Sequence, residues 1–262
     1  MEYNKDSLYT YLLYSQPISY NNVLTFYPVK MKDYLKFQVL AQSVQVRKDS
    51  WFGDKKTIKM GYGEFLWDIM TRRPELAKQV KKEWLVNCYI YFLSLLTLCC
   101  ELDTKDLAYN TATGAIQVKD YTLTETDIDN IRRIIILQNG IDFDVDEFIN
   151  RDTEEALKKA KKANNKTEDK ATLEDYIDSA MVALHYSERE IAEMPVRKFW
   201  RLIERLNLHE NYIIMRTGEC SGMVTFKEPI KHWMVELDNG DKYKDAKADE
   251  TALHNKINGA NG

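Results

Sequence analysis

The sequence predicts a mainly helical α+β protein, with a bundle-like helical core, small β-hairpins and an extended C-terminal arm. Three stretches, "TETD" at 124–127, "TLED" at 172–175 and "SERE" at 187–190, have the Ser/Thr-x-x-Asp/Glu pattern that starts helices. The two segments with alternating apolar residues are short and far apart. Strands and helices are therefore segregated, which disfavours a doubly wound parallel sheet.

The bulk composition indicates a folded protein and disfavours one class of function. The composition, 44% hydrophobic and 30% charged, is that of a folded protein. The length of 262 residues is sufficient for one large domain or two ordinary ones. A net charge of -4 disfavours a general binder of phosphate backbones. The N-terminus lacks a basic region followed by an apolar region, so we expect an intracellular protein.

The N-terminal third predicts one hairpin and several helices. Residues 17–29 alternate around an Asn-Asn pair, which indicates a β-hairpin, and residues 31–46 have helical spacing. An exposed loop is expected near residue 50, and the next helix covers residues 58–70. Pro74 separates that helix from another one.

The most apolar stretch, "WLVNCYIYFLSLLTLCC" at residues 84–100, has two interpretations. Its length approaches that of a membrane-spanning helix. It is short for this purpose, however, and contains Asn87, Ser94 and Thr97. We therefore expect a central helix that other helices surround, and no membrane contact.

The middle of the chain predicts a second hairpin and a well-delimited helix. Residues 108–123 contain a Gly turn followed by alternating apolar residues. A helix over residues 125–138 starts at Thr124, with Asp127 three residues later, and stops near Gly140.

A change of composition suggests the domain boundary. Residues 151–170 are rich in helix formers and almost lack large apolar groups, as in a charged helix or linker. The predicted division is an α+β domain over residues 1–150, this linker, and a helical domain with an extended tail over 171–262. Three successive helices are expected over residues 172–215, with Pro195 in the first turn of the last one.

The sequence contains no recognisable catalytic, cofactor-binding or metal-binding motif. Asp142, Asp144 and Asp146 resemble the start of a calcium loop, but Glu147 stands where that loop needs glycine. The histidines are widely separated, and the four cysteines form no CxxC pair: His185, His209, His232, His254, Cys88, Cys99, Cys100 and Cys220. The lysines at 158–162 are flanked by acids, so a solvated mixed-charge face is expected there, and no nucleic-acid partner.

The stretch "SGMVTFKEPIKHWM" at residues 221–234 is extended and apolar after the last strong helix. One hypothesis is an arm that docks on the protein's own helices or on a neighbouring copy. The alternative is a terminal strand that covers the local core. The residues that would make either contact are Met223, Val224, Phe226, Ile230 and Trp233. The polar segment that follows is expected to be a mobile or partner-ordered tail.

Three stretches resemble bacteriophage tail-morphogenesis proteins, especially tail assembly chaperone-like proteins. They are "LTFYPVKMKDYLKF", "YSEREIAEMPVRKFWRLIERL" and "CSGMVTFKEPIKHWM". The resemblance implies a non-enzymatic protein in the host cytoplasm that engages tape-measure, tail-tube or baseplate partners during assembly. The hypothesis of a docking arm adds self-association as a further expectation. A permanent tail or baseplate subunit, which would lie in the virion tail, and an unrecognised enzyme remain alternatives.

The resemblance and the arm together select the residues expected to contact partners. These are Arg197, Phe199, Trp200, Met223, Phe226, Ile230 and Trp233. Because adjacent aromatic residues on a helix point in different directions, at least one of Phe199 and Trp200 is also expected to face the core.

Overall fold

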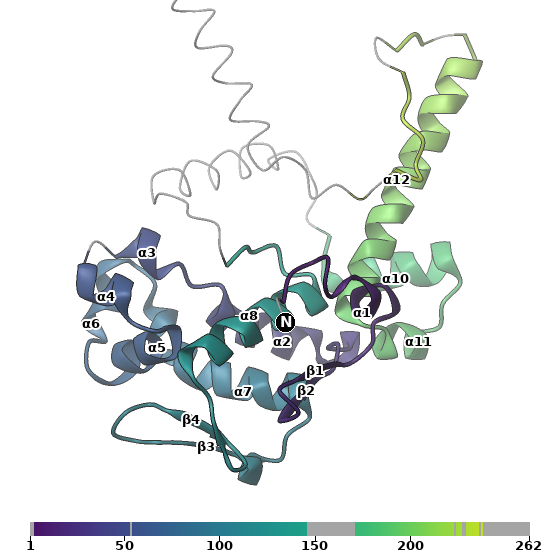
Figure 1. Cartoon of the computed structure of the whole chain (residues 1–262). Coiled ribbons are helices and arrows are strands. Elements are labelled where there is room, and N and C mark those ends of the chain that lie inside the picture. Colours follow the sequence, from purple (N-terminus) through teal and green to yellow (C-terminus); the bar gives the residue numbers. More distant parts are fainter. Residues whose placement is uncertain are drawn as a thin grey trace, which may run out of the picture. The chain divides into compact units, whose positions relative to one another are not determined.

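The computed structural model describes residues 3–52, 54–145, 171–222, 224–226, 229–235 and 237 (Figure 1). The chain forms two compact units, Met1–Phe148 with Tyr186–Trp200, and Ile149–His185 with Arg201–Gly262. The elements are mainly helical with two small antiparallel sheets, so the predicted fold class is confirmed. The proposed linker, 151–170, lies outside the described residues, and residues 186–200 group with the N-terminal part of the chain.

The first unit starts with a short helix and the predicted hairpin. Helix α1 (Tyr9–Tyr14) precedes strands β1 (Ile18–Tyr20) and β2 (Leu24–Phe26), which pair antiparallel with Tyr20 opposite Leu24. Asn21 and Asn22 in the connection have φ of 49° and 56°, in the left-handed region that asparagine tolerates better than most residues. The Asn-Asn pair therefore forms the turn as the sequence predicts.

The predicted helix over residues 31–46 is divided into three pieces. These are η1 (Met31–Asp33), α2 (Tyr34–Leu40) and η2 (Ala41–Val44), in which η denotes a 3-10 helix. The Ser43 hydroxyl donates a hydrogen bond to the carbonyl oxygen of Leu40, 2.7 Å away. Such local bonding competes with regular α-helical bonding, which accounts for the tighter last turn.

The region around residue 50 is not the exposed loop that we expected. It contains α3 (Lys48–Trp51) and α4 (Lys55–Lys59), and Trp51 and Phe52 are buried. The predicted pair of helices follows as α5 (Tyr62–Thr71) and α6 (Glu75–Gln79), separated at Pro74. The apolar side chains of Trp51 and Phe52 thus indicated burial of this region more reliably than the charged residues around them indicated exposure.

The most apolar stretch forms η3 (Glu83–Asn87) and α7 (Cys88–Cys100). Residues 83–100 are long and apolar enough for a membrane span, and half of this window is buried. Helix α7 contacts α2, η2, α5 and β2, and its buried side chains include Tyr89 and Phe92. It is the central helix of the first unit, as the sequence predicts.

The second sheet has one strand more than predicted. After η4 (Thr104–Asp106), β3 (Leu107–Tyr109), β4 (Ile116–Val118) and β5 (Tyr121–Thr122) form an antiparallel sheet in the order β3-β4-β5. Gly114, with φ of 73°, lies against Trp67, since a Cβ at this position would be 2.3 Å from Trp67 Cγ. The turn thus requires glycine for both conformation and space.

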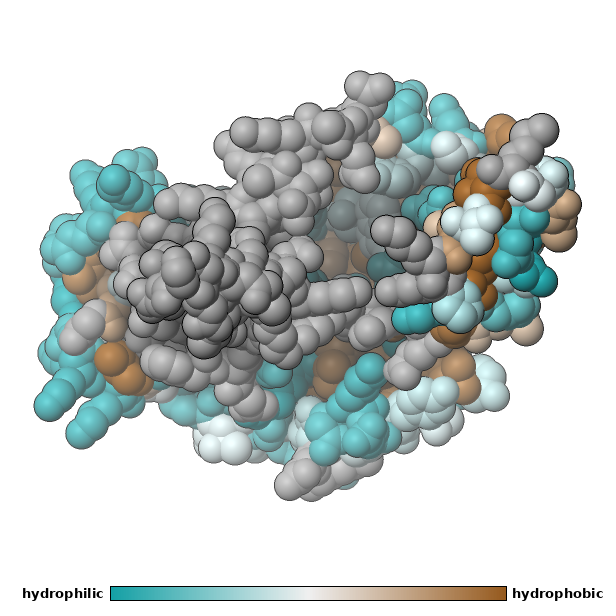
Figure 2. All heavy atoms as spheres, turned by 90° about the horizontal axis from the view of Figure 1, so that it is seen from above, coloured by the Kyte–Doolittle hydropathy of each residue, from teal (hydrophilic) through white to brown (hydrophobic). Residues whose placement is uncertain are grey.

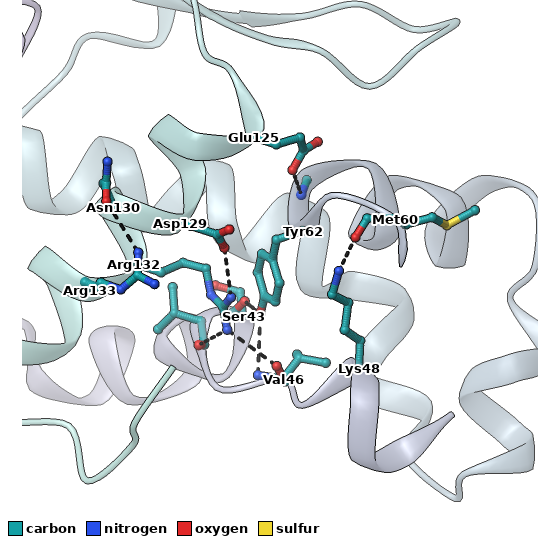
Figure 3. A network of polar contacts seen from close by, with 12 residues as sticks. Ser43, Val46, Lys48, Met60, Tyr62, Glu125, Asp129, Asn130, Arg132 and Arg133 are labelled. Atoms are coloured by element: carbon teal, nitrogen blue, oxygen red, sulfur yellow. Dashed lines mark hydrogen bonds and ion pairs between the residues drawn. The ribbon is translucent and has the colours of Figure 1, made fainter. Parts of the chain in front are cut away.

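Helix α8 (Glu125–Asn139) links the elements of the first unit through a buried polar network (Figure 3). The guanidinium of Arg132 lies 3.4 Å from the centre of the Tyr62 ring and donates hydrogen bonds to the carbonyl oxygens of Val44 and Val46. The Tyr62 hydroxyl donates to the carbonyl oxygen of Ser43, 2.6 Å away. Burial raises the pKa of Tyr62, so the phenol remains a donor. The network joins α8, α5 and the end of η2.

The three helices predicted for the C-terminal region are present. They are α10 (Leu173–Leu184), α11 (Glu188–Glu193) and α12 (Val196–Cys220). Thr172 and Ser187 form the predicted capping boxes with Asp175 and Glu190. Pro195 lies directly before α12, and this helix extends five residues past the predicted end at residue 215.

Candidate interaction surface

The segment that contains α11 and the start of α12 is joined to the N-terminal part of the first unit by backbone bonds. Lys30 and Pro195 form an isolated β-bridge. The Val196 amide donates to the carbonyl oxygen of Val29 at 2.8 Å, and the Met31 amide donates to that of Met194 at 2.9 Å. The chain therefore returns to its N-terminal region before it continues into the second unit.

Two lysines and one glutamate strengthen this junction. The Nζ atoms of Lys30 and Lys32 each lie 2.6 Å from a different carboxylate oxygen of Glu193. Hydrogen bonds from Lys30 and Lys32 lower the pKa of Glu193 to about 2. All three side chains are substantially exposed, so salt screens this interaction.

Three residues expected to contact partners have internal contacts in the first unit. Arg197 Nη1 donates to the carbonyl oxygen of Leu12 at 2.9 Å. Phe199 is only 1% exposed, as the sequence argument for one inward-facing aromatic predicts. Trp200 is half-buried, and its ring centroid lies 5.7 Å from that of Tyr34. These side chains contribute to the packing of the first unit.

In the second unit the chain reverses after α12 and runs back along it (Figure 1). We call residues 224–235 the arm, of which 224–226 and 229–235 are described. Gly222, with φ of 71°, lies at the reversal, and Val224 comes close to Gly218. The described arm residues form no strand, and Met223, one of the expected contact residues, lies outside the described part.

Trp233 attaches the arm to α12. Its carbonyl oxygen accepts a hydrogen bond from Arg205 Nη1 at 2.7 Å, and its ring centroid lies 5.0 Å from that of His209 in an edge contact. His232 makes a similar ring contact, at 5.0 Å, with Tyr212. Phe226, Ile230 and Trp233 are all partly buried. In this structure the arm docks on the protein's own helix, which was one of the expectations.

We call Arg205, His209 and Tyr212 the seat of the arm. Their spacing of four and then three residues places them on one face of α12. None of these three residues was predicted from the sequence to make a contact. Their spacing was the one sequence feature that could have indicated a shared contact, but the same spacing also occurs on ordinary solvated helix faces.

The end of α12 exposes apolar side chains in several directions. Ile213, Ile214 and Met215 are 49%, 68% and 43% exposed. Because successive helical residues are rotated by about 100°, three in a row point to three sides of the helix. Figure 2 shows apolar residues reaching the surface over this region among hydrophilic ones. Among the described residues of the second unit, Ala180 and Ile203 are the buried apolar ones.

Several residues with shifted pKa values also lie close together around Asp127 in the first unit. Asp127 accepts hydrogen bonds from the hydroxyls of Tyr20, at 2.6 Å, and Tyr121, at 3.0 Å, and from Thr124. Burial, together with the bond to Asp127, raises the pKa of Tyr20 to about 12. Burial alone would raise the pKa of Asp127, but these hydrogen bonds lower it. The cluster joins the first hairpin, β5 and the start of α8, and its bonds account for these shifts.

No group of three or more His, Cys, Asp and Glu side chains within the described ranges has an arrangement suited to a metal ion. The exposed apolar side chains at the end of α12, together with the arm, are the feature of the described residues best suited to recognition of another molecule.

Part of the chain matches a protein-family model. Residues 161–238 match the family model described as the YomV second domain, which represents a phage-derived protein family. The matched range includes α10, α11, α12 and the whole arm. No curated protein and no solved structure matches the chain. Over this range the chain is therefore similar to a domain of a phage-derived protein family.

Proposed function

We propose that this chain is a non-enzymatic bacteriophage tail assembly protein, chaperone-like, that binds tape-measure, tail-tube or baseplate subunits during tail morphogenesis. In this proposal it acts in the host cytoplasm through protein surfaces and needs no cofactor. The similarity of residues 161–238 to a domain of a phage-derived family supports the phage part of the proposal. The resemblance of the three stretches quoted above supports the tail-assembly part.

The exposed end of α12 is the observation that carries the binding role. A helix that is apolar on several sides normally lies inside a protein or an assembly. Ile213, Ile214 and Met215 extend such a surface beyond the face that the arm covers. An apolar helix of a tail subunit that packs beside α12 would cover these side chains, in the way that helices dock on apolar grooves and faces.

Helix α10 supports the same role. Tyr176, Ile177, Ala180, Met181 and Leu184 share a helical spacing of three and four residues, and of these only Ala180 is fully buried. The described part of the second unit therefore has amphipathic helices with little buried core. A partner that binds the folded unit stabilises it, and the apolar side chains left outside the core are available for burial against that partner.

The binding role is tested with a matched pair of substitutions on α12. Ile214→Asp places a charge on the exposed apolar surface, and Asn211→Asp places the same charge at an exposed polar position of the same helix. We expect Ile214→Asp to weaken binding of purified tape-measure, tube or baseplate proteins about tenfold or more, and Asn211→Asp to leave it nearly unchanged. Equal effects of the two substitutions would contradict a role for this surface.

The assembly role is tested by quantitative mass spectrometry of phage particles. A chaperone-like protein is present in lysates of producing cells and absent from purified virions. A fixed copy number in virions would instead establish the alternative, a permanent tail or baseplate subunit. Normal tails from a phage that lacks the gene would reject both forms of the proposal.

A further inference from the structure

We propose that the arm docks in trans as well as in cis, so that two copies of this chain exchange arms across their α12 helices. The inference concerns only the second unit, and it stands independently of the tail-assembly role. In the exchanged form, the arm of a second copy binds the seat. It would make the contacts that the structure shows between the seat and the arm of the same chain.

The seat and the arm are complementary because they already bind each other. Arg205 donates to the backbone of Trp233, while His209 and Tyr212 contact the rings of Trp233 and His232. Every copy of the chain carries both halves of this pair. An exchanged dimer would therefore keep the same contacts and would change the chain path only at the reversal.

The reversal depends on a short hinge. Ser221 and Gly222 donate backbone hydrogen bonds to Thr217 and Glu219 at 3.0 and 3.1 Å, so the helical path continues up to the turn. The left-handed conformation of Gly222 then turns the chain back. A Cβ at Gly222 would meet nothing within 4 Å, so there is space for a side chain here. Glycine is favoured at this position because of the left-handed backbone conformation. An extended conformation at this one residue would direct the arm away from its own helix.

The exchanged form removes apolar surface that the cis form leaves in water. On α12, Ile213, Ile214 and Met215 are exposed, and on the arm Val224, Met234 and Val235 are 47%, 65% and 39% exposed. Two copies joined by their arms bring two such surfaces close together, so both can be covered. Residues 201–235 contain five Lys and Arg and four Asp and Glu, which gives a formal charge of 5 - 4 = +1. Like-charge repulsion between the two copies is therefore small.

The geometry near the hinge allows a direct test with a disulfide. A Cβ at Gly218 would lie 4.0 Å from Val224 Cβ, which is within the range of disulfides. Gly218→Cys with Val224→Cys, in a Cys220→Ser background, would lock the arm in cis if the protein is oxidised while dilute and monomeric, because in an exchanged dimer the same two positions meet between copies. The background removes the exposed natural thiol, whereas Cys88, Cys99 and Cys100 are buried.

We expect the full-length protein to show a concentration-dependent dimer by light scattering or sedimentation velocity. The oxidised double-cysteine variant should be monomeric at the same concentrations, and reduction should restore the dimer. A wild-type protein that is monomeric up to about 100 μM, well above the Kd of specific associations, would overturn the proposal. A dimer that forms on concentrating the variant oxidised as a monomer would also overturn it, whereas oxidation of the concentrated protein should give a dimer linked by disulfides.

Three further variants distinguish exchange from a simple loss of folding. Gly222→Val disfavours the left-handed turn, so we expect more dimer, whereas unfolding would not produce a defined dimer. Trp233→Ala and Arg205→Ala weaken the same arm–seat contact from its two sides, in the monomer and in the exchanged dimer alike, so each should leave the dimer Kd nearly unchanged. In a mixed dimer, the intact arm of one copy meets the intact seat of the other, and both losses fall on the second contact, where they overlap. Mixed dimers should therefore clearly exceed about half of all dimers, the share that random pairing gives. A share of about half would contradict the exchange.

Discussion

Glu125, the first residue of α8, caps the N-terminus of α5, more than sixty positions earlier in the chain. Its carboxylate oxygens accept hydrogen bonds from the backbone amides of Gly63, at 2.9 Å, and Glu64, at 3.0 Å. These amides belong to the first turn of α5, where backbone amides have no acceptor within their own helix. Gly61 and Gly63 leave the space, because a Cβ at Gly61 would lie 2.1 Å from Glu125 Cδ.

Glu125→Ala should lower the free energy of unfolding of the first unit by about 1–2 kcal/mol, the range of helix-cap losses. The negative charge also favours the positive end of the α5 dipole. Glu83→Ala, at an exposed position before α7, is the control and should change stability by less than about 0.5 kcal/mol. Urea unfolding followed by circular dichroism gives both values, and equal losses would contradict the capping role.

Arg132→Ala should destabilise the first unit by about 2–4 kcal/mol. It removes the guanidinium from the Tyr62 ring and leaves the buried carbonyls of Val44 and Val46 without that donor. The matched control is Arg133→Ala, since Arg133 is the next residue and is partly exposed. Chemical unfolding of both variants checks the prediction, and a loss below about 1 kcal/mol at Arg132 would show that the network contributes little.

Phe199→Ala and Trp233→Ala should separate the packing of the two units. Phe199 is 1% exposed, so its truncation should cost the first unit about 3–5 kcal/mol. Trp233 is partly buried on α12 in the second unit, and its truncation should leave the unfolding of the first unit unchanged. Hydrogen exchange of α7 amides reports on the first unit alone. Loss of α7 protection in Trp233→Ala would contradict this separation.

Asp127 should contribute to acid sensitivity. Its pKa in the folded protein lies below its ordinary value of 3.8, because the hydrogen bonds from Tyr20, Thr124 and Tyr121 outweigh the effect of burial. Its stabilising contribution is thus complete above about pH 4 and is lost as the pH falls through the lower, folded pKa. Asp127→Asn should be less stable than the wild type at pH 7, and the difference should shrink below pH 4.

The control for this pH dependence is Asp120→Asn, at an exposed position before β5. Thermal unfolding measured from pH 7 to pH 2 should give parallel curves for this variant and the wild type. A gap between Asp127→Asn and the wild type that stays constant over the whole range would show that the carboxylate charge is not the cause.

Local signals predicted the elements well where the chemistry acts within a few residues. The capping boxes at Thr124, Thr172 and Ser187, the Asn21-Asn22 turn and the stop at Gly140 depend on neighbours within one turn. The Ca-loop pattern at Asp142 and the lysines at 158–162 were also judged from local spacing, but Asp146 and the lysines lie outside the described residues.

The contact surface was harder to predict, because the burial of a side chain depends on what packs against it. Phe199, Trp200 and Arg197 were selected for partner contacts, and the structure shows their contacts within the first unit. Ile213 and Ile214 were not selected, although they are the more exposed side chains. Nothing in the local sequence says which apolar residues of a helix lack a neighbour.

The sequence alone predicted the helical class, the two hairpins, the capped starts of α8, α10 and α11 and the buried character of α7, because capping, turn chemistry and apolar periodicity are local. The tertiary structure decided which distant segments meet. It joins Glu125 to the first turn of α5, and it brings residues 186–200 back to Lys30, so that continuous sequence is divided between two units. It also places Trp233 on His209. These contacts join residues that are far apart in the chain, so they cannot be predicted from a short segment of sequence.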